Sequence, residues 1–178
     1  FADIQVLRYE VKGFETLSPK QKELAYYLYM AGMSGRDIFY DQKYKNNLRI
    51  RKTIETVLET YTGDKNADDY KKFETYAQRF FFANGIHHHY SADKMIPEFN
   101  PEFLKELLAK SDQTKLPLEG MTSSAFADFL NPILFDPNVA PKCVDLSSDK
   151  DRVVASANNF YEGVTEKEVE DFYAKMTL

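Results

Sequence analysis

The sequence predicts a mainly α-helical fold (α+β overall), a multi-helix domain with one peripheral strand at its N-terminus. Three observations lead to this prediction. Apolar side chains recur at spacings of three and four along most of the 178 residues. Several of these stretches open with residues that cap helices. No internal repeat and no low-complexity linker divides the chain, so we treat residues 1–178 as a single helical domain.

The exception to the helical pattern lies at residues 4–11. Val, Leu and Tyr in an extended-looking run predict a strand that Gly13 ends. Residues 152–155 offer a second, shorter strand candidate. An isolated pair of strands is marginally stable in water. We therefore expect the first strand to be peripheral, or to pair with sequence outside this chain.

The first helix is predicted to start at Ser18-Pro19, where Ser18 and Gln21 form a capping box. Its inner stripe is predicted to comprise Leu24, Tyr27, Leu28 and Ala31. A second helix spans about residues 44–61, with Ile50, Ile54, Val57, Leu58 and Tyr61 on its apolar face. The basic residues beside that face, Arg49, Arg51 and Lys52, are typical of a solvated surface.

The strongest helical pattern covers about residues 67–83, where Tyr70, Phe73, Ala77 and Phe80 follow the helical spacing. Phe80, Phe81 and Phe82 point apolar groups in several directions. We expect this end of the helix to be buried on more than one side. The segment that follows should therefore leave a packed interior rather than a flexible tip.

Three further helices are predicted in the second half. Asn100-Pro101 opens one, with a contact between Phe99 and Leu104 across its start. Another begins after Thr122, and Pro132 is expected to kink or end it unless the pattern restarts through residue 135. The last opens with a capping box at Thr165.

Composition excludes several classes of protein. The net charge of −5 offers no basic field for phosphates, so we expect no nucleic-acid partner. The apolar runs are too short to span a membrane. Cys143 is the only cysteine, which excludes a disulfide scaffold. Because the chain starts at Phe1, we expect an upstream segment. The compartment stays open between the cytoplasm and, if that segment is a signal peptide, the periplasm or cell envelope.

The most informative stretch is residues 84–90, which contains all three histidines just after a glycine. In an extended segment His87 and His89 would share one face and His88 the other. Two imidazoles are too few for a closed zinc site, which Asp93 or Glu98 would have to complete. We favour a loop that lines a cleft and offers hydrogen bonds. A locally satisfied structural loop is the alternative.

A second stretch, residues 155–165, has small residues, then two amides and two aromatics, then a glycine before a capped helix. This composition suits a tight loop that presents side chains, and Asn159 is its candidate binding residue. The alternative is a plain connector, since Asn and Gly are common in turns for backbone reasons.

Residues 1–11, 17–24, 35–38, 84–97 and 159–165 resemble the N-terminal part of dipeptidyl peptidase III, in particular the Bacteroidetes-type enzymes. The resemblance runs along the whole chain and rests on many local matches. The family comprises zinc-dependent peptidases that release dipeptides from peptide N-termini. Its members have a helical, zinc-bearing lobe and a barrel-bearing lobe around a wide cleft. The resemblance places this chain in the barrel-bearing lobe.

The family's zinc motifs, H-E-x-x-x-H and E-E-x-x-A-D, are absent from this sequence. The resemblance therefore implies a segment of a larger enzyme, with no cofactor in this chain and zinc in the parent protein. We assign no catalytic and no metal-binding residue. The expected substrate-binding residues are His87, His89, Tyr90 and Asn159, on one wall of a peptide cleft. The expected partners are a peptide substrate and the remaining lobe. The alternative is a standalone helical module that binds a protein partner without catalysis.

Overall fold

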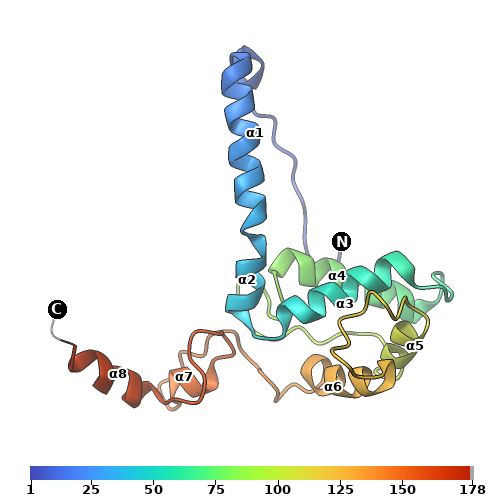
Figure 1. Ribbon diagram of the computed structural model, residues 1–178, viewed down its shortest axis with the longest axis vertical. Helices are drawn as coiled ribbons and strands as arrows, with labels where there is room; N and C mark the ends of the chain where they lie inside the picture. The colour runs from blue at the N-terminus through green and yellow to red at the C-terminus, as the bar shows by residue number, and fades with distance from the viewer. Residues whose placement is uncertain (177–178) are drawn as a thin grey trace.

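The structure, a computed structural model, describes residues 1–176. Helices α3 to α6 form a compact body, while α1 stands out from it as a long arm (Figure 1). Helices α7 and α8 extend away from the body on the side of α2, at the lower left of the same view. The helices are η1 (Phe14–Thr16), α1 (Pro19–Ser34), α2 (Arg36–Lys43), α3 (Asn47–Thr60), α4 (Asp68–Ala83), α5 (Phe103–Ala109), α6 (Ser123–Phe135), α7 (Arg152–Ala155) and α8 (Glu166–Ala174).

The prediction of a mainly helical chain is confirmed, but the predicted strand is wrong. Residues 4–11 form no strand, because no other segment of residues 1–176 pairs with their backbone. The second candidate, residues 152–155, forms helix α7. The side chain of Asp151 caps α7 by accepting hydrogen bonds from the N–H groups of Val153 and Val154. At residues 152–155 the cap from Asp151 therefore decides for a helix, although the β-branched valines favour a strand.

The helix starts predicted at Ser18, Thr122 and Thr165 are confirmed, but α5 begins at Phe103 rather than at Pro101, and Asn100 does not cap it. Ser18 and Gln21 form a capping box, as do Thr165 and Glu168. The Thr122 hydroxyl accepts a hydrogen bond from the N–H of the third helical residue of α6. Pro132 neither ends nor divides α6, which continues to Phe135. The turn of α6 that includes Pro132 packs its neighbours Ile133 and Leu134 into the core.

Helix α2 is a feature that the sequence pattern does not indicate. It follows α1 directly, with Gly35 between them in a right-handed conformation (φ −85°). Glycines at 32 and 35 lower helix propensity and favour a break over a new helix. Helix α2 nevertheless forms, and it packs against α3 and buries Tyr40.

The core lies between α3, α4, α5 and α6 and is rich in aromatic rings, as the composition predicts. Tyr61 stacks on Tyr70 with ring centroids 5.1 Å apart. Phe99 meets Phe135 edge to face at 5.3 Å, which joins the segment before α5 to the end of α6. Phe80, near the end of α4, is completely buried. Burial at the end of α4 is therefore confirmed for Phe80, whereas Phe82 is exposed.

The expectation of a solvated surface fails for Arg49, whose guanidinium lies 4.5 Å from the centroid of the Phe126 ring, and it fails for Arg51. Its side chain is buried and pairs with Asp37 of α2 and with Glu55, at 2.9 Å. The guanidinium also lies 5.1 Å from the centroid of the Tyr40 ring. The cation is tolerated inside because two carboxylates and an aromatic face replace its hydration. Arg51 thereby fixes α2 on α3.

A buried amide joins three segments of the body. Asn47, at the start of α3, donates from Nδ2 to the carbonyl of Tyr40 at 3.0 Å. Its Oδ1 accepts from the N–H of Ile86 at 3.2 Å. Gly85 packs so closely against this amide that a Cβ atom there would overlap it. Gly85 also has φ +143°, which disfavours any side chain. Asn47 therefore sets where the histidine segment leaves α4.

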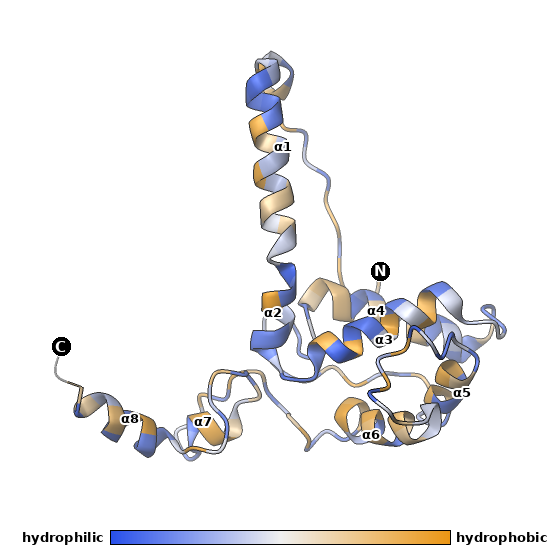
Figure 2. Ribbon diagram, in the orientation of Figure 1, coloured by the Kyte–Doolittle hydropathy of each residue, from blue (hydrophilic) through white to orange (hydrophobic). Residues whose placement is uncertain are grey.

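The predicted inner stripe of α1 faces no partner within residues 1–176, because none of its side chains is buried. Apolar residues lie among polar ones along the arm, and α8 carries a similar mixture (Figure 2). The most exposed large side chains on the arm are Leu24, Tyr26, Tyr27, Leu28 and Tyr29, each more than half exposed. Contiguous apolar surface of this kind is typical of an interaction site.

Replacing Asn47 with Ala should destabilise the body by about 3 kcal/mol, since it leaves a buried carbonyl at Tyr40 and a buried N–H at Ile86 without partners. Urea unfolding followed by circular dichroism measures this change. The matched control is Asn66→Ala at an exposed turn, which should change the free energy of unfolding by less than about 0.5 kcal/mol. Equal stability of the two variants would contradict the proposed role of Asn47.

Candidate functional site

The histidine segment begins with a left-handed turn at the end of α4. Asn84 has φ +55°, and the N–H of Gly85 donates to the carbonyl of Phe80 at 3.0 Å. The chain then enters the core, so that Ile86 and His87 are buried. His87 Nε2 donates to the carbonyl of Ala140 at 2.8 Å, while Nδ1 has no partner. Burial lowers the pKa of His87 to about 4, so the imidazole is neutral near pH 7.

His87 and His89 do not share a face, contrary to the prediction. His87 is 2% exposed, whereas His89 is at the surface and its ring lies against those of His88 and Phe82, at 4.3 and 4.7 Å. The segment is not extended after His87, because the carbonyl of His88 accepts from the N–H of Ala92 and closes a turn. Tyr90 lies on this turn and is 90% exposed.

Hydrogen bonds from Lys94 hold the turn at residues 136–141 in place. The Lys94 ammonium donates to the carbonyls of Asp136 at 2.6 Å and Val139 at 2.8 Å. The backbone N–H of Lys94 donates to the carbonyl of Pro141 at 2.9 Å. Burial lowers the pKa of Lys94 to about 8. Together with the bond from His87, these contacts fix a turn in which Ala140 has φ +50°.

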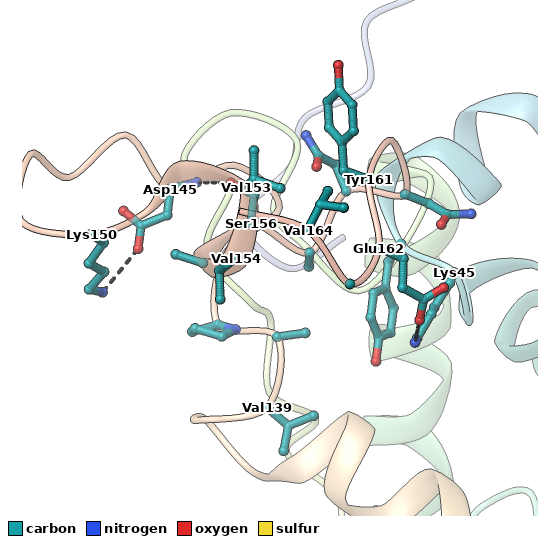
Figure 3. A pocket seen from close by; sticks show the side chains of 18 of the residues that line it. Lys45, Val139, Asp145, Lys150, Val153, Val154, Ser156, Tyr161, Glu162 and Val164 are labelled. Atoms are coloured by element: carbon teal, nitrogen blue, oxygen red, sulfur yellow. Dashed lines mark hydrogen bonds and ion pairs between the residues drawn. The ribbon is translucent and has the colours of Figure 1, made fainter. Parts of the chain in front are cut away.

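This turn forms one side of a large cavity with a volume of about 750 Å³. Residues 153–165, which lead from α7 to α8, form the other side, and Figure 3 shows Val153, Val154 and Val164 in the lining. Asn159 also lines the cavity, and its backbone N–H donates to the carbonyl of Gln42 at 2.8 Å. The cavity therefore lies between the helical body and the C-terminal segment.

Two ion pairs flank the apolar lining (Figure 3). Lys45 and Glu162 pair at 2.5 Å, and both side chains are more than half exposed. Lys150 pairs at 3.1 Å with Asp145, whose side chain is buried. Hydrogen bonds from the hydroxyl and the N–H of Ser147 hold the pKa of Asp145 far below its usual range. The two pairs lie on opposite sides of the lining, and within each pair the two charges neutralise one another (Figure 3).

The histidine segment is not built to hold zinc. Residues 1–176 contain no group of three His, Cys, Asp or Glu side chains arranged for a metal ion. His87 uses Nε2 for the Ala140 carbonyl, Asp93 lies 3.5 Å from Lys142, and Glu98 lies 3.6 Å from Arg79. His87 is buried and Asp93 and Glu98 pair with cations, so these three side chains are not assembled as a ligand set.

The Cys143 thiol is not placed as a nucleophile. It is half-buried, and its Sγ donates to the carbonyl of Lys43 at 3.5 Å. Burial raises the pKa of the thiol above its usual value. A raised pKa reduces the thiolate fraction, and the thiolate is the reactive form.

The structure brings only some of the predicted residues to one place. Asn159 lines the large cavity, and His87 supports its opposite wall through Ala140 without lining it. His89 instead borders a smaller recess beside the N-terminal segment. Sequence reasoning missed Lys94 and Asp145, since single charged residues in loops give no signal of burial. The closely spaced prolines at 137 and 141 were the one sign in the sequence of an ordered turn there.

Comparison of the sequence with models of protein families finds no match, and comparison with curated proteins finds none either. No helix among residues 1–176 combines the length and the apolar character needed to cross a bilayer.

Stability should fall on mild acidification because of His87. Its pKa is about 4 when folded, against an ordinary value of about 6.5, so the unfolded chain binds more protons between these values. This contribution is complete above pH 6.5 and is lost as the pH falls toward 4. From pH 7 to pH 5 we expect a loss of about 2 kcal/mol from this group.

Urea unfolding at the two pH values measures the loss. The His87→Gln protein, which keeps a donor for Ala140 but does not titrate, should lose about 2 kcal/mol less than the wild type. The control, His89→Gln, changes an exposed ring and should behave as the wild type does. An unchanged pH dependence in His87→Gln would contradict the assignment.

Proposed function

We propose that this chain is an N-terminal segment of a zinc-dependent dipeptidyl peptidase, within its barrel-bearing lobe, and supplies part of the wall of the peptide cleft. The observation that carries the proposal is the uncovered apolar surface of α1, whose side chains have no cover within residues 1–176. A remaining lobe would cover such a surface. The resemblance of residues 84–97 and 159–165 to dipeptidyl peptidase III names the enzyme.

The residues take different parts in this proposal. Asn159 offers a side-chain amide in the lining of the large cavity, and His89 and Tyr90 offer polar groups on the exposed turn. Amides, imidazoles and phenols can each donate and accept hydrogen bonds, as recognition of a peptide backbone requires. His87 is buried, so its part is to position the turn at residues 136–141 rather than to touch substrate. The zinc ion and its ligands belong to the parent enzyme.

The alternative is a standalone helical module that binds a protein partner through the same arm. The exposed aromatic side chains of α1 favour this function as well, because tyrosines are common in protein interfaces. The reading frame in the source genome discriminates between the two. Zinc-ligand motifs downstream of residue 178 support the peptidase. A reading frame without these motifs supports the interaction module instead.

Substitution of Asn159 by Ala in the intact enzyme should raise KM for short peptides about fivefold, the effect of one lost hydrogen bond, with little change in kcat. Tyr90→Ala should act in the same direction. Steady-state release of dipeptides measures both. The control is Asn66→Ala, an amide exposed far from the cavity. Unchanged kinetics in both variants would remove the cleft role while leaving membership in the enzyme intact.

The isolated chain should self-associate, because its arm exposes apolar surface to water. Leu28→Glu places a charge on that surface and should shift the protein toward the monomer. Light scattering coupled to gel filtration measures the mass. The control, Gln78→Glu, adds the same charge on the solvent side of α4 and should leave the mass unchanged. A wild-type chain that stays monomeric at high concentration would contradict this prediction.

A further inference from the structure

The turn that presents Tyr90 depends on the side chain of His88. Nδ1 of the His88 ring accepts hydrogen bonds from the backbone N–H groups of Tyr90 and Ser91, each at 3.2 Å. A ring nitrogen accepts only when it carries no proton, so the neutral ring must hold its proton on Nε2. Among residues 1–176 the two N–H groups have no other hydrogen-bond partner. One imidazole nitrogen therefore holds the tip of this turn.

The base of the same turn is held without the ring. The N–H of His88 donates to the carbonyl of Asp93 at 2.7 Å, and the N–H of Ala92 donates to the carbonyl of His88 at 3.1 Å. The carbonyl of Ala92 accepts from the N–H of Cys143 at 2.8 Å, which ties the base to a neighbouring segment. The tip, residues 89–91, therefore relies on the imidazole, while the base does not.

Protonation of the His88 ring removes both bonds to the tip. An imidazolium carries a proton on each ring nitrogen and has no acceptor left. Its Nδ1–H would face two backbone N–H groups, so three donors would meet without an acceptor. The closed turn accommodates only the neutral ring, and acid therefore favours an open tip.

No neighbouring group takes over the two bonds. The titratable and charged side chains around the ring are Asp3, Arg79, His89, Asp93 and Lys142. Asp3 and Arg79 pair with each other at 3.1 Å. The carboxylate of Asp93 lies 3.5 Å from the Lys142 ammonium. The His89 ring lies beside the His88 ring, with centroids 4.3 Å apart, and accepts no bond from the tip.

We propose that His88 is a pH-dependent positioning residue for Tyr90. The neutral ring closes the tip of the turn, and the protonated ring releases it, so that the Tyr90 phenol loses its fixed place. This change belongs to the turn itself and does not depend on the peptidase assignment. Its consequence for peptide binding rests on the proposed function, in which Tyr90 offers a polar group to the substrate.

The test is nuclear magnetic resonance of the purified chain at about pH 8 and about pH 5, the range in which histidines usually change charge. At the higher pH the ring nitrogen shifts should place the His88 proton on Nε2. Backbone order parameters at residues 90 and 91 should be about 0.85 there and fall below about 0.6 at the lower pH. Those of Ala92 and Asp93 should not change.

Three results would overturn the proposal. They are a proton on Nδ1 of His88 at the higher pH, a His88 ring that stays neutral at the lower pH, and a tip that stays rigid after the ring is protonated.

Variants separate the acceptor from the ring. His88→Asn does not titrate and keeps an acceptor, because an Asn side-chain oxygen commonly accepts from the N–H two residues further on. Its tip should stay rigid at both pH values. His88→Phe keeps a ring without an acceptor, so its tip should be mobile at both. The control, His89→Asn, removes the neighbouring titratable ring and should respond as the wild type does. A tip that loosens in acid in His88→Asn, or that is rigid in His88→Phe, would contradict the role of Nδ1.

Kinetics of the intact enzyme test the consequence for binding. Acidification should raise KM for a short peptide about fivefold more in the wild type than in His88→Asn, the effect of one lost hydrogen bond. Equal pH dependence of KM in the two proteins, with the resonance response intact, would contradict the part of Tyr90 in peptide binding and leave the pH-dependent turn in place.

Discussion

The structure depends on one buried amide, that of Asn47. It is the point where the end of α2, the start of α3 and the exit from α4 meet. An amide suits this place because it can donate to one backbone group and accept from another at the same time. The close approach of Gly85 lets the amide reach both. A hydrophobic side chain of the same size would pack but leave two backbone groups unpaired, which explains why a polar residue occupies a core position.

The consequences of this contact reach the large cavity. Once Asn47 has directed the chain inward at Ile86, His87 arrives beneath Ala140 and Lys94 arrives beneath Asp136 and Val139. Neither side chain touches the space that it shapes. The left-handed Ala140 is unfavourable by itself and persists because hydrogen bonds fix the residues around it. The histidine segment therefore contributes to the cavity mainly by supporting its wall.

The capping signals at three helix starts proved reliable, whereas predictions that depend on contacts distant in sequence did not. The caps at Ser18, Thr122 and Thr165 involve residues three apart, so the sequence alone contains the whole interaction. The strand at residues 4–11 depends on a partner strand, which no pattern in this chain could guarantee. The burial of Arg51 and His87 depends on segments far away in sequence. Side chains alternate between two faces of an extended chain, so the sequence predicted a shared face for His87 and His89. The chain turns tightly at Ala92 instead, and the segment is not extended.

Helix α1 shows why local signals are insufficient by themselves. Its capping box and the proline at its first position define where it starts, and its 16 residues fit four to five turns. Isolated helices of about this length are marginal in water, and most helical stability in proteins comes from packing. With no buried residue of its own, α1 gains little from the body. Its apolar residues can stabilise it only when another surface covers them. The arm is therefore best understood as one half of an interface, and a remaining lobe of the parent enzyme is the partner that the proposed function supplies.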